Sequence, residues 1–334
     1  MQRADDNAHH PSVEKRRPFF DWVGRWGMLP AMAVLVGAGL STIFASGARA
    51  YWRFELLCHF RVQYFWALTA AAVFLWIARR RLAASTAAVL AAANLALILP
   101  LYFGPGPHGN AGPAVRALSL NVYLNNPDHA ATLELILREQ PDIVYLMEVS
   151  PRWSETLEAL AADYPHRKLI LRWGTDGVAL LSRFAFRGVE VRGLPGGGLP
   201  TLVAEVAAPG GDFTLIAAHP ASPGSRQNVE LRNRQFVELA ELAQDRAGPV
   251  MILGDLNSTG WSPYFGRLIE DSGLADSRQG FGVEPTWPRF PLPLRIPIDH
   301  CLASPEISIV DRRVGPSVGS DHRPLLVDFA LPER

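Results

Sequence analysis

The sequence predicts an α/β domain of mixed β-sheets covered by helices, preceded by three membrane-spanning helices. Three observations lead to this fold class. Long runs without a charged residue fill most of the first hundred positions. A segment rich in Gly and Pro follows at 104–113 and is expected to be a linker. Beyond it, short apolar segments of strand length are interspersed with amphipathic segments of helical periodicity.

Three uncharged runs occupy 26–48, 62–78 and 82–103, with lengths of 23, 17 and 22 residues. A membrane-spanning helix needs roughly 17–25 mostly apolar residues, so we expect each run to cross a lipid bilayer. A cleaved signal peptide would supply one short apolar region instead of three. The alternative is a buried helical hairpin of a soluble domain, which run lengths in the spanning range disfavour.

Positive charge is distributed unequally around these runs. The N-terminal tail, residues 1–25, and the loop at 79–81 together carry eight Lys and Arg residues, against three between 49 and 61. By the positive-inside rule, the tail and the 79–81 loop are cytoplasmic, and everything after Phe103 lies outside the cell membrane.

The remaining segment, 114–334, has about 220 residues and is large enough to form one extensive core. From Asn110 onward the chain has 21 Lys and Arg against 27 Asp and Glu, a net charge of −6. The segment therefore lacks the strongly basic footprint of many nucleic-acid-binding domains. Its single cysteine, Cys301, cannot form a disulfide within the domain, and the other cysteine of the chain is Cys58.

Hydrophobic periodicity and turn residues predict the elements of the first half of this domain. Asn126 and Pro127 are expected to open its first helix as N-cap and first-turn residue, and Pro141 to end it. That helix lies between strands at 114–122 and 142–148, and a helix at 151–163 follows. Five short strands are then predicted at 166–172, 177–182, 188–194, 201–207 and 212–219.

The second half begins with the longest amphipathic segment, predicted to be a helix at 226–246. A buried strand at 249–255 and a short helix at 263–272 follow. The last strands are predicted at 296–303, 306–311 and 323–329. Because many strands follow one another as in hairpins, with helices among them, the order favours mixed sheets over a simple parallel sheet.

Polar residues recur where the predicted strands end. GDLNS at 254–258 ends a buried apolar strand with Asp255 and Asn257. Residues two apart on a strand point to one face, so both side chains can share a pocket, although Gly, Asp, Asn and Ser are also common in turns. The other polar strand ends are Asn121, Glu148, His219, Asp299 with His300, and Ser320, Asp321 and His322. Together they favour a functional site on loops held by a rigid sheet.

These residues, in this order, resemble the endonuclease/exonuclease/phosphatase superfamily, which includes DNase I-like nucleases, abasic-site endonucleases, neutral sphingomyelinases and inositol-polyphosphate 5-phosphatases. The resemblance covers about 115–329, and its motifs are PDIVYLMEV at 141–149, GVALLSR at 177–183, GDLN at 254–257 and GSDHRP at 319–324. It implies a four-layer α/β sandwich, with two sheets face to face and helices outside, as the catalytic domain at 114–334.

The resemblance also implies hydrolysis of a phosphate-ester substrate with Mg²⁺ or Mn²⁺ as cofactor. Hard divalent cations prefer oxygen ligands, and Glu148 is the leading predicted ligand, assisted by Asn121 and Asp321. Zinc is less consistent with the sequence, because the histidines lack a zinc-site spacing and no Cys pair accompanies them.

Five further residues receive catalytic roles from the same resemblance. Asp255 is expected to activate or orient the attacking water. Asn257 and His219 are expected to donate hydrogen bonds to the phosphate oxygens. His322 is expected to contact the phosphate in its protonated form, with Asp299 orienting the ring and raising its pKa.

Two departures from the family pattern leave the substrate class open. Tyr123 stands where nucleases often have an acidic residue, and Pro220 follows His219 where several phosphodiesterases have Leu. Nucleic acid, phospholipid head groups and small phosphate esters remain as classes. The block at 285–304 is most similar to a membrane-anchored bacterial branch, which implies a multi-pass protein of the bacterial inner membrane with a periplasmic or extracellular domain. The alternative function is a catalytically silent membrane sensor or binding module, which the complete set of polar positions disfavours.

Overall fold

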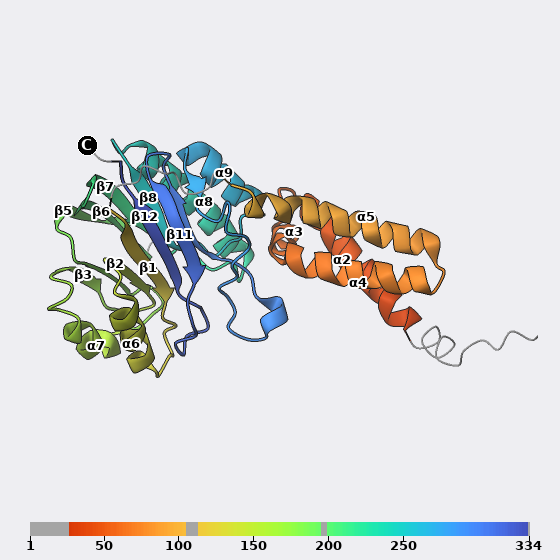
Figure 1. Cartoon of the computed structure of the whole chain (residues 1–334), viewed down its shortest axis with the longest axis horizontal. Helices are drawn as coiled ribbons and strands as arrows, with labels where there is room; N and C mark the ends of the chain where they lie inside the picture. The colour runs from red at the N-terminus through yellow and green to blue at the C-terminus, as the bar shows by residue number, and fades with distance from the viewer. Residues whose placement is uncertain (1–26, 105–112, 195–198, 333–334) are drawn as a thin grey trace, which may run out of the picture.

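The computed structural model describes residues 27–104, 113–194 and 199–332, which form an α/β domain with a helical arm extending from one end (Figure 1). The predicted cytoplasmic tail, 1–25, and most of the predicted linker, 104–113, lie outside the described residues. We call residues 28–102 the helical arm and residues 113–332 the α/β domain.

The helical arm contains three segments that are long and apolar enough to cross a membrane, Met28–Ser46, Trp52–Ile77 and Arg81–Tyr102. Its elements are α2 (Met28–Ser46), α3 (Trp52–Leu57), η1 (Cys58–Phe60), α4 (Arg61–Ile77), α5 (Arg81–Ile98) and η2 (Leu99–Tyr102). The second segment begins ten residues before the predicted start at 62, because the predicted loop after Tyr51 is itself helical.

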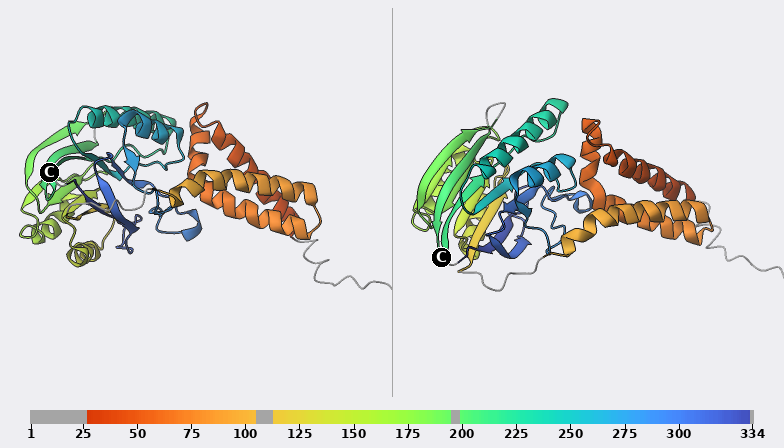
Figure 2. Two further views of the ribbon diagram at one scale, coloured as in Figure 1. Left: turned by 45° about the horizontal axis from the view of Figure 1, so that its top comes forward. Right: turned by 90° about the horizontal axis from the view of Figure 1, so that it is seen from above.

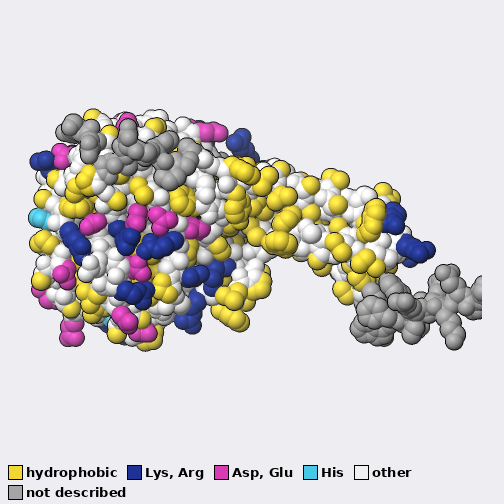
Figure 3. Space-filling model, in the orientation of Figure 1, with side chains coloured by type: hydrophobic (Ala, Val, Ile, Leu, Met, Phe, Trp, Pro, Cys, Tyr) yellow, Lys and Arg dark blue, Asp and Glu magenta, His cyan; other side chains and the backbone are white. Residues whose placement is uncertain are grey.

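The apolar surface of the helical arm is exposed along its length (Figure 3). Trp66, Leu82 and Val89 are examples of large apolar side chains that no other described part of the chain covers. A helical hairpin buried in a soluble domain would hide such side chains, so their exposure disfavours this alternative. Lipid is the environment in which a helix apolar on all sides is stable.

The α/β domain is built on two mixed sheets, as predicted, and each sheet has six strands. The first has the order β11-β12-β1-β2-β4-β3, and the second β5-β6-β7-β8-β10-β9. In each sheet one neighbouring pair is parallel, β1 with β2 and β7 with β8, and the other pairs are antiparallel. The strands are β1 (Val115–Asn121), β2 (Ile143–Met147), β3 (His166–Ile170), β4 (Val178–Ser182), β5 (Phe186–Gly193), β6 (Pro200–Ala208), β7 (Gly211–Ala217), β8 (Val250–Asp255), β9 (Ala275–Asp276), β10 (Asp299–Ala303), β11 (Ser308–Val314) and β12 (Leu325–Ala330).

Three apolar layers hold the domain together, and they confirm the four-layer sandwich. Both sheets bury one face in a shared central core that includes Tyr145, Leu215 and Phe329. α6 (His129–Glu139) and α7 (Ser154–Ala159) cover the outer face of the first sheet. α8 (Arg226–Gln244) and α9 (Pro263–Ser272) cover the outer face of the second (Figure 2). The central strands are therefore buried on both faces and read as continuous apolar runs.

Two local predictions differ from the structure. α6 begins after Asp128, whose carboxylate accepts a hydrogen bond from the Ala131 N–H, so the predicted N-cap at Asn126 is wrong. The Asn126 side chain instead accepts from the Asp128 N–H and donates to the Val318 carbonyl. β9 was not predicted, because a strand of two residues has no periodicity to detect.

The helical arm is joined to the α/β domain by hydrogen bonds that each involve at least one backbone carbonyl. The Gln63 amide donates to the Arg295 carbonyl at 2.9 Å. The Trp261 indole N–H donates to the Leu97 carbonyl at 3.1 Å. The N–H groups of Gly280 and Gly282 both donate to the Leu101 carbonyl. The ends of the second and third candidate spans are thus fixed to the domain.

Candidate active site

The polar strand ends predicted from the sequence meet at one edge of the sandwich. Asn121 ends β1, and Glu148 follows the end of the parallel neighbour β2. Asp255 ends β8 and pairs directly with Asp299, the first residue of the antiparallel β10. The two sheets face each other here, and the Asn121 amide nitrogen lies 3.3 Å from an Asp255 carboxylate oxygen across the gap.

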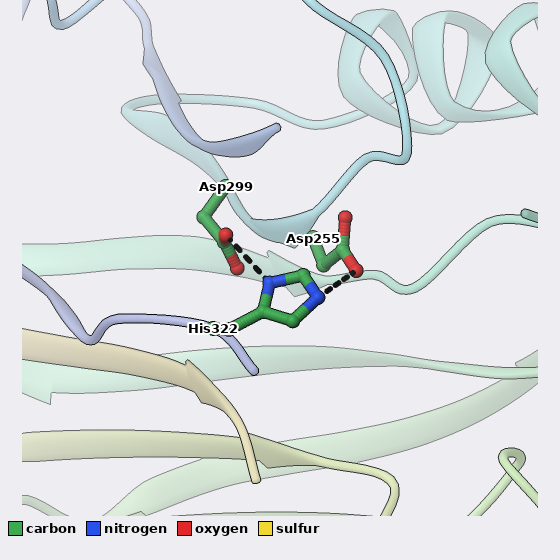
Figure 4. Close-up of side chains that lie close together, drawn as sticks. All are labelled: Asp255, Asp299 and His322. Carbon is green, nitrogen blue, oxygen red and sulfur yellow. Dashed lines mark hydrogen bonds and ion pairs between the residues drawn. The ribbon is translucent and has the colours of Figure 1, made fainter. Parts of the chain in front are cut away.

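His322 joins two carboxylates of the second sheet (Figure 4). Its Nδ1 lies 2.9 Å from Asp299 Oδ2, and its Nε2 lies 3.6 Å from Asp255 Oδ2. All three side chains are buried. The loop that carries His322 is held by Ser320, whose hydroxyl accepts from the His322 N–H and donates to the Asn121 carbonyl. The predicted pairing of Asp299 with His322, 23 positions apart, is therefore present.

The buried charges of this cluster shift the pKa values of Asp255 and His322. Burial alone would lower the pKa of His322, but the Asp299 and Asp255 carboxylates outweigh it and raise this pKa to about 10. Burial raises the pKa of Asp255 to about 6, against the attraction of protonated His322. At neutral pH the site therefore holds an imidazolium beside an Asp255 carboxylate whose basicity suits proton transfer at that pH.

The cluster of Asp255, Asp299 and His322 has its ligand atoms within 4.8 Å of one another, a spacing that a metal ion could use. Metal-bound imidazole must be neutral and must offer a nitrogen lone pair. His322 is protonated at neutral pH and directs Nδ1 to Asp299. In this protonation state the three residues form a hydrogen-bonded cluster, and His322 offers no lone pair to a cation.

Glu148, the leading predicted cation ligand, follows β2 at the edge of the pocket. Its carboxylate lines the pocket, where it accepts hydrogen bonds from the Asn121 amide and from the Leu124 N–H, both at 3.0 Å. Its backbone is left-handed, with φ of 63°, as is that of Asn257, with φ of 51°. Non-glycine residues held in this region concentrate at functional sites.

The predicted assisting ligands lie beside Glu148 with defined partners of their own. The Asn121 amide nitrogen donates to Glu148 and to Asp255, while its oxygen accepts from the Tyr123 N–H. An Asp321 carboxylate oxygen accepts from the Trp287 indole at 3.0 Å, and its side chain lines the same pocket. Both remain predicted ligands, and Asn121 also fixes the orientation of Glu148.

Asn257 and His219 complete the set around Asp255. The Asn257 N–H donates to Asp255 Oδ1 at 2.8 Å, and its side-chain amide donates to the Pro220 carbonyl. His219 Nε2 lies 3.6 Å from Asp255 Oδ2. Gly254 allows the backbone around Ala218 to come close to β8. With its φ of 147°, a Cβ at position 254 would lie 2.0 Å from the Ala218 carbonyl oxygen. The strand ends of β7 and β8 can therefore lie side by side.

Seven of the eight predicted site residues line one pocket of about 480 Å³. The eighth, Asp299, is buried behind His322. The pocket is also lined by residues that the sequence did not single out, including Trp287 and, from the helical arm, Leu56, His59 and Phe60. These arm residues lie between two predicted spans, and their contact with positions some 200 residues later leaves no trace in local periodicity.

The helical arm is also bonded to the loop that carries Asn257. Glu55 and Arg232 form an ion pair at 2.9 Å with both side chains fully buried. A second guanidinium nitrogen of Arg232 donates to the Asn257 carbonyl at 3.1 Å. Nearby, His59 Nδ1 lies 3.0 Å from the Thr259 hydroxyl. The start of the second candidate span thus supports one wall of the site.

Comparison with known proteins places this geometry in context. Residues 118–322 match the Endonuclease/Exonuclease/phosphatase family. No curated protein matches the chain significantly. The fold is similar to an endonuclease/exonuclease/phosphatase from Beutenbergia cavernae, at 24% identity and a TM-score of 0.54 over 66% of this chain and 72% of that one. It is also similar to truncated Caenorhabditis elegans TDP2, at 19% identity and a TM-score of 0.52 over 65% of this chain and 98% of that one. The human Nocturnin catalytic domain with bound sulfate matches at 18% identity and a TM-score of 0.53, over 66% and 96% of the two chains.

Proposed function

Because the chain belongs to the endonuclease/exonuclease/phosphatase family, and is thereby a hydrolase of phosphoric ester bonds, we propose that it cleaves its substrate at the Asp255–Asp299–His322 cluster with a divalent cation held at Glu148. The observation that carries this proposal is geometric: Glu148, Asp255 and His322 line one pocket, and the His322 ring lies between the Asp299 and Asp255 carboxylates.

The side chains of the pocket divide the chemistry among them. The Asp255 carboxylate accepts the proton of the attacking water. His322 Nε2 is too far from Asp255, at 3.6 Å, for a good hydrogen bond, so its N–H is free to donate to a phosphate oxygen. Asn257 and His219 add further polar contacts to that phosphate. Asp299 keeps the His322 ring oriented and charged.

The composition of the pocket supports a divalent cation. Among the described residues that line it, three are carboxylates, Glu148, Asp255 and Asp321, and none is Lys or Arg. Repulsion between these carboxylates and a phosphate anion has to be offset by more positive charge than His322 alone carries. Glu148, assisted by Asp321 and Asn121, offers the oxygen donors that Mg²⁺ or Mn²⁺ prefers. When bound, such a cation polarises the phosphoryl oxygen as a Lewis acid.

Metal dependence tests this proposal directly. We expect the purified full-length protein to hydrolyse bis-p-nitrophenyl phosphate with Mg²⁺ or Mn²⁺, and to lose this activity in EDTA. Glu148→Gln keeps the side-chain shape but removes the charge, so it should raise the Mg²⁺ concentration needed for half-maximal activity by about 10-fold or more. Glu205→Gln, an exposed change on β6, is the control and should leave that concentration unchanged. Turnover that persists in EDTA would refute the cation role.

We also propose that the three candidate spans anchor the protein in the bacterial inner membrane with the α/β domain outside. The three apolar segments and the unequal distribution of Lys and Arg support this orientation. Reporter enzymes fused after Arg80 and after Asn110 should report opposite sides of the membrane. A cytoplasmic signal from both fusions would contradict the proposed topology.

A further inference from the structure

The pocket has an apolar part that phosphate chemistry does not explain. Beside its polar residues, it is lined by large apolar side chains, which we call the apolar lining. The apolar lining consists of Leu56, Phe60, Leu199, Trp287, Ile296 and Ile298. Polar phosphate esters and sugars gain little from such a surface, whereas a hydrocarbon chain gains about 0.8 kcal/mol for each methylene that leaves water.

Part of the apolar lining belongs to a candidate membrane span. Leu56 and Phe60 lie within the apolar segment Trp52–Ile77, near its first residue. The helical arm leaves the α/β domain from this same side (Figure 2). If Trp52–Ile77 crosses a bilayer, the pocket therefore lies at the bilayer surface, where it can receive a molecule from the adjoining leaflet.

A loop next to the pocket has the composition of a membrane-contacting segment. In this loop, 287–296, the apolar side chains Phe290, Leu292 and Leu294 are 78%, 62% and 49% exposed. Arg289 flanks them and is exposed, whereas the Arg295 guanidinium donates to the Pro288 and Arg289 carbonyls of the same loop. The loop is the blue segment with a short helix below the arm in Figure 1, and apolar side chains gather there in Figure 3. An apolar tip beside an exposed Arg suits an interface with anionic head groups.

The same loop connects the bilayer surface to the pocket. The Gln63 amide of α4 donates to the Arg295 carbonyl, which holds the loop against the second candidate span. At its two ends, Trp287 and Ile296 pair in a β-bridge and line the pocket. The base of the loop therefore lines the pocket, while its apolar tip is exposed.

Resting on the proposed hydrolase function, we propose that the substrate is a membrane lipid that carries a phosphate ester. Its phosphate lies at the Asp255 and His322 cluster, and its hydrocarbon chain lies along the apolar lining toward the bilayer. Hydrolysis forms a bond from water oxygen to phosphorus and breaks one P–O ester bond. Asp255 takes the proton of the water, and the leaving oxygen departs as an alcohol after protonation from solvent.

A nucleic-acid substrate fits these observations less well. Binding of a polynucleotide depends mainly on Lys and Arg that neutralise its phosphates. The described residues that line the pocket include neither residue type. Leu56, His59 and Phe60 of the helical arm also line the pocket.

A matched pair of substrates tests the lipid proposal on the full-length protein in detergent micelles. Hexadecyl 4-nitrophenyl phosphate and methyl 4-nitrophenyl phosphate share the reacting phosphodiester and the leaving group, and differ in the chain alone. We expect kcat/KM to be at least about 100-fold higher for the hexadecyl ester. A second pair, hexadecyl phosphate and butyl phosphate, applies the same test if the enzyme accepts only monoesters. For this pair the released inorganic phosphate is measured.

Variants of the apolar lining distinguish two causes of a faster reaction with the hexadecyl ester. One cause is contact between its hydrocarbon chain and the lining, and the other is enrichment of the long ester in the micelle. Leu56→Gln and Phe60→Gln should lower the hexadecyl-to-methyl ratio by about 10-fold, because they place an amide in the apolar lining. Val191→Gln, an exposed change on β5, is the matched control and should keep the ratio. Micelle enrichment is the same for all three variants, and a general loss of folding lowers both rates without changing their ratio.

The outcomes distinguish failure of the lipid proposal from failure of the proposed function. Comparable rates for the long and short esters, or a ratio unchanged in both Leu56→Gln and Phe60→Gln, would overturn the lipid proposal while leaving the hydrolase function intact. If the wild-type protein hydrolysed none of the four compounds with Mg²⁺ or Mn²⁺ present, the proposed function itself would be wrong, and the lipid proposal with it.

Discussion

His322→Ala is expected to lower kcat for phosphodiester hydrolysis by on the order of 10³-fold or more, which is the size of effect seen when a key transition-state donor is lost. The variant removes both the buried positive charge and the Nε2–H group that Asp255 does not use. The phosphate would then face Asp255 and Glu148 with one cationic partner fewer. Turnover of the purified full-length protein at saturating Mg²⁺ is the measurement.

Asp299 acts on the substrate only through His322, so its loss should not add to the loss of the ring. Asp299→Asn should cost less than His322→Ala, because the imidazole remains in place. The double variant should be little slower than His322→Ala alone, since groups that act as one unit have non-additive effects. A double loss equal to the product of the single losses would show that the residues act independently. Melting temperatures of all three variants separate a catalytic loss from unfolding.

The second large effect is expected where the helical arm meets the α/β domain. Arg232→Ala leaves the Glu55 carboxylate buried without its partner at 2.9 Å and removes the donor to the Asn257 carbonyl. Breaking a fully buried ion pair by removing one partner costs about 3–5 kcal/mol, so the melting temperature in detergent should fall by several degrees. Thermal unfolding of the purified protein measures this effect.

A paired variant shows whether the cost comes from the stranded charge. Glu55→Gln combined with Arg232→Gln removes both charges and leaves two amides that can bond each other, so it should be clearly more stable than Arg232→Ala. The exposed pair of Arg226 with Glu230 on α8 is the control, and Arg226→Ala should change the melting temperature little. An Arg232→Ala protein as stable as the wild type would mean that the contact between arm and domain is dispensable.

The sequence predicted those features that follow from local pattern. Uncharged runs marked the three candidate spans, and apolar strands that end in Asp255 and Glu148 marked the edge of the sandwich. The pairing of Asp299 with His322 came from family resemblance, because no rule of spacing connects residues 23 positions apart. The helix cap at Asp128 was missed because Asn126, two residues earlier, is an equally good capping residue by type.

Contacts between distant parts of the chain account for what the sequence did not predict. Glu55 lies between the first two predicted spans, and Arg232 lies in the predicted helix at 226–246, and no local pattern relates them. Only the docking of the arm brings them together as a buried pair. Likewise, Leu56 and Phe60 were indistinguishable from other apolar residues near a span, and their place in the pocket depends on the tertiary structure.

The most direct test of the proposed chemistry is the pH dependence of kcat/KM for bis-p-nitrophenyl phosphate at saturating Mg²⁺. The rate should rise with pH as Asp255 loses its proton near pH 6, because only the carboxylate can accept the proton of water. It should fall as His322 loses its proton near pH 10. In Asp299→Asn the alkaline fall should move to lower pH, because a carboxylate that raises the pKa of His322 is gone. An alkaline fall at the same pH in both proteins, or none in either, would contradict the assignment of His322 as the buried cation of the site.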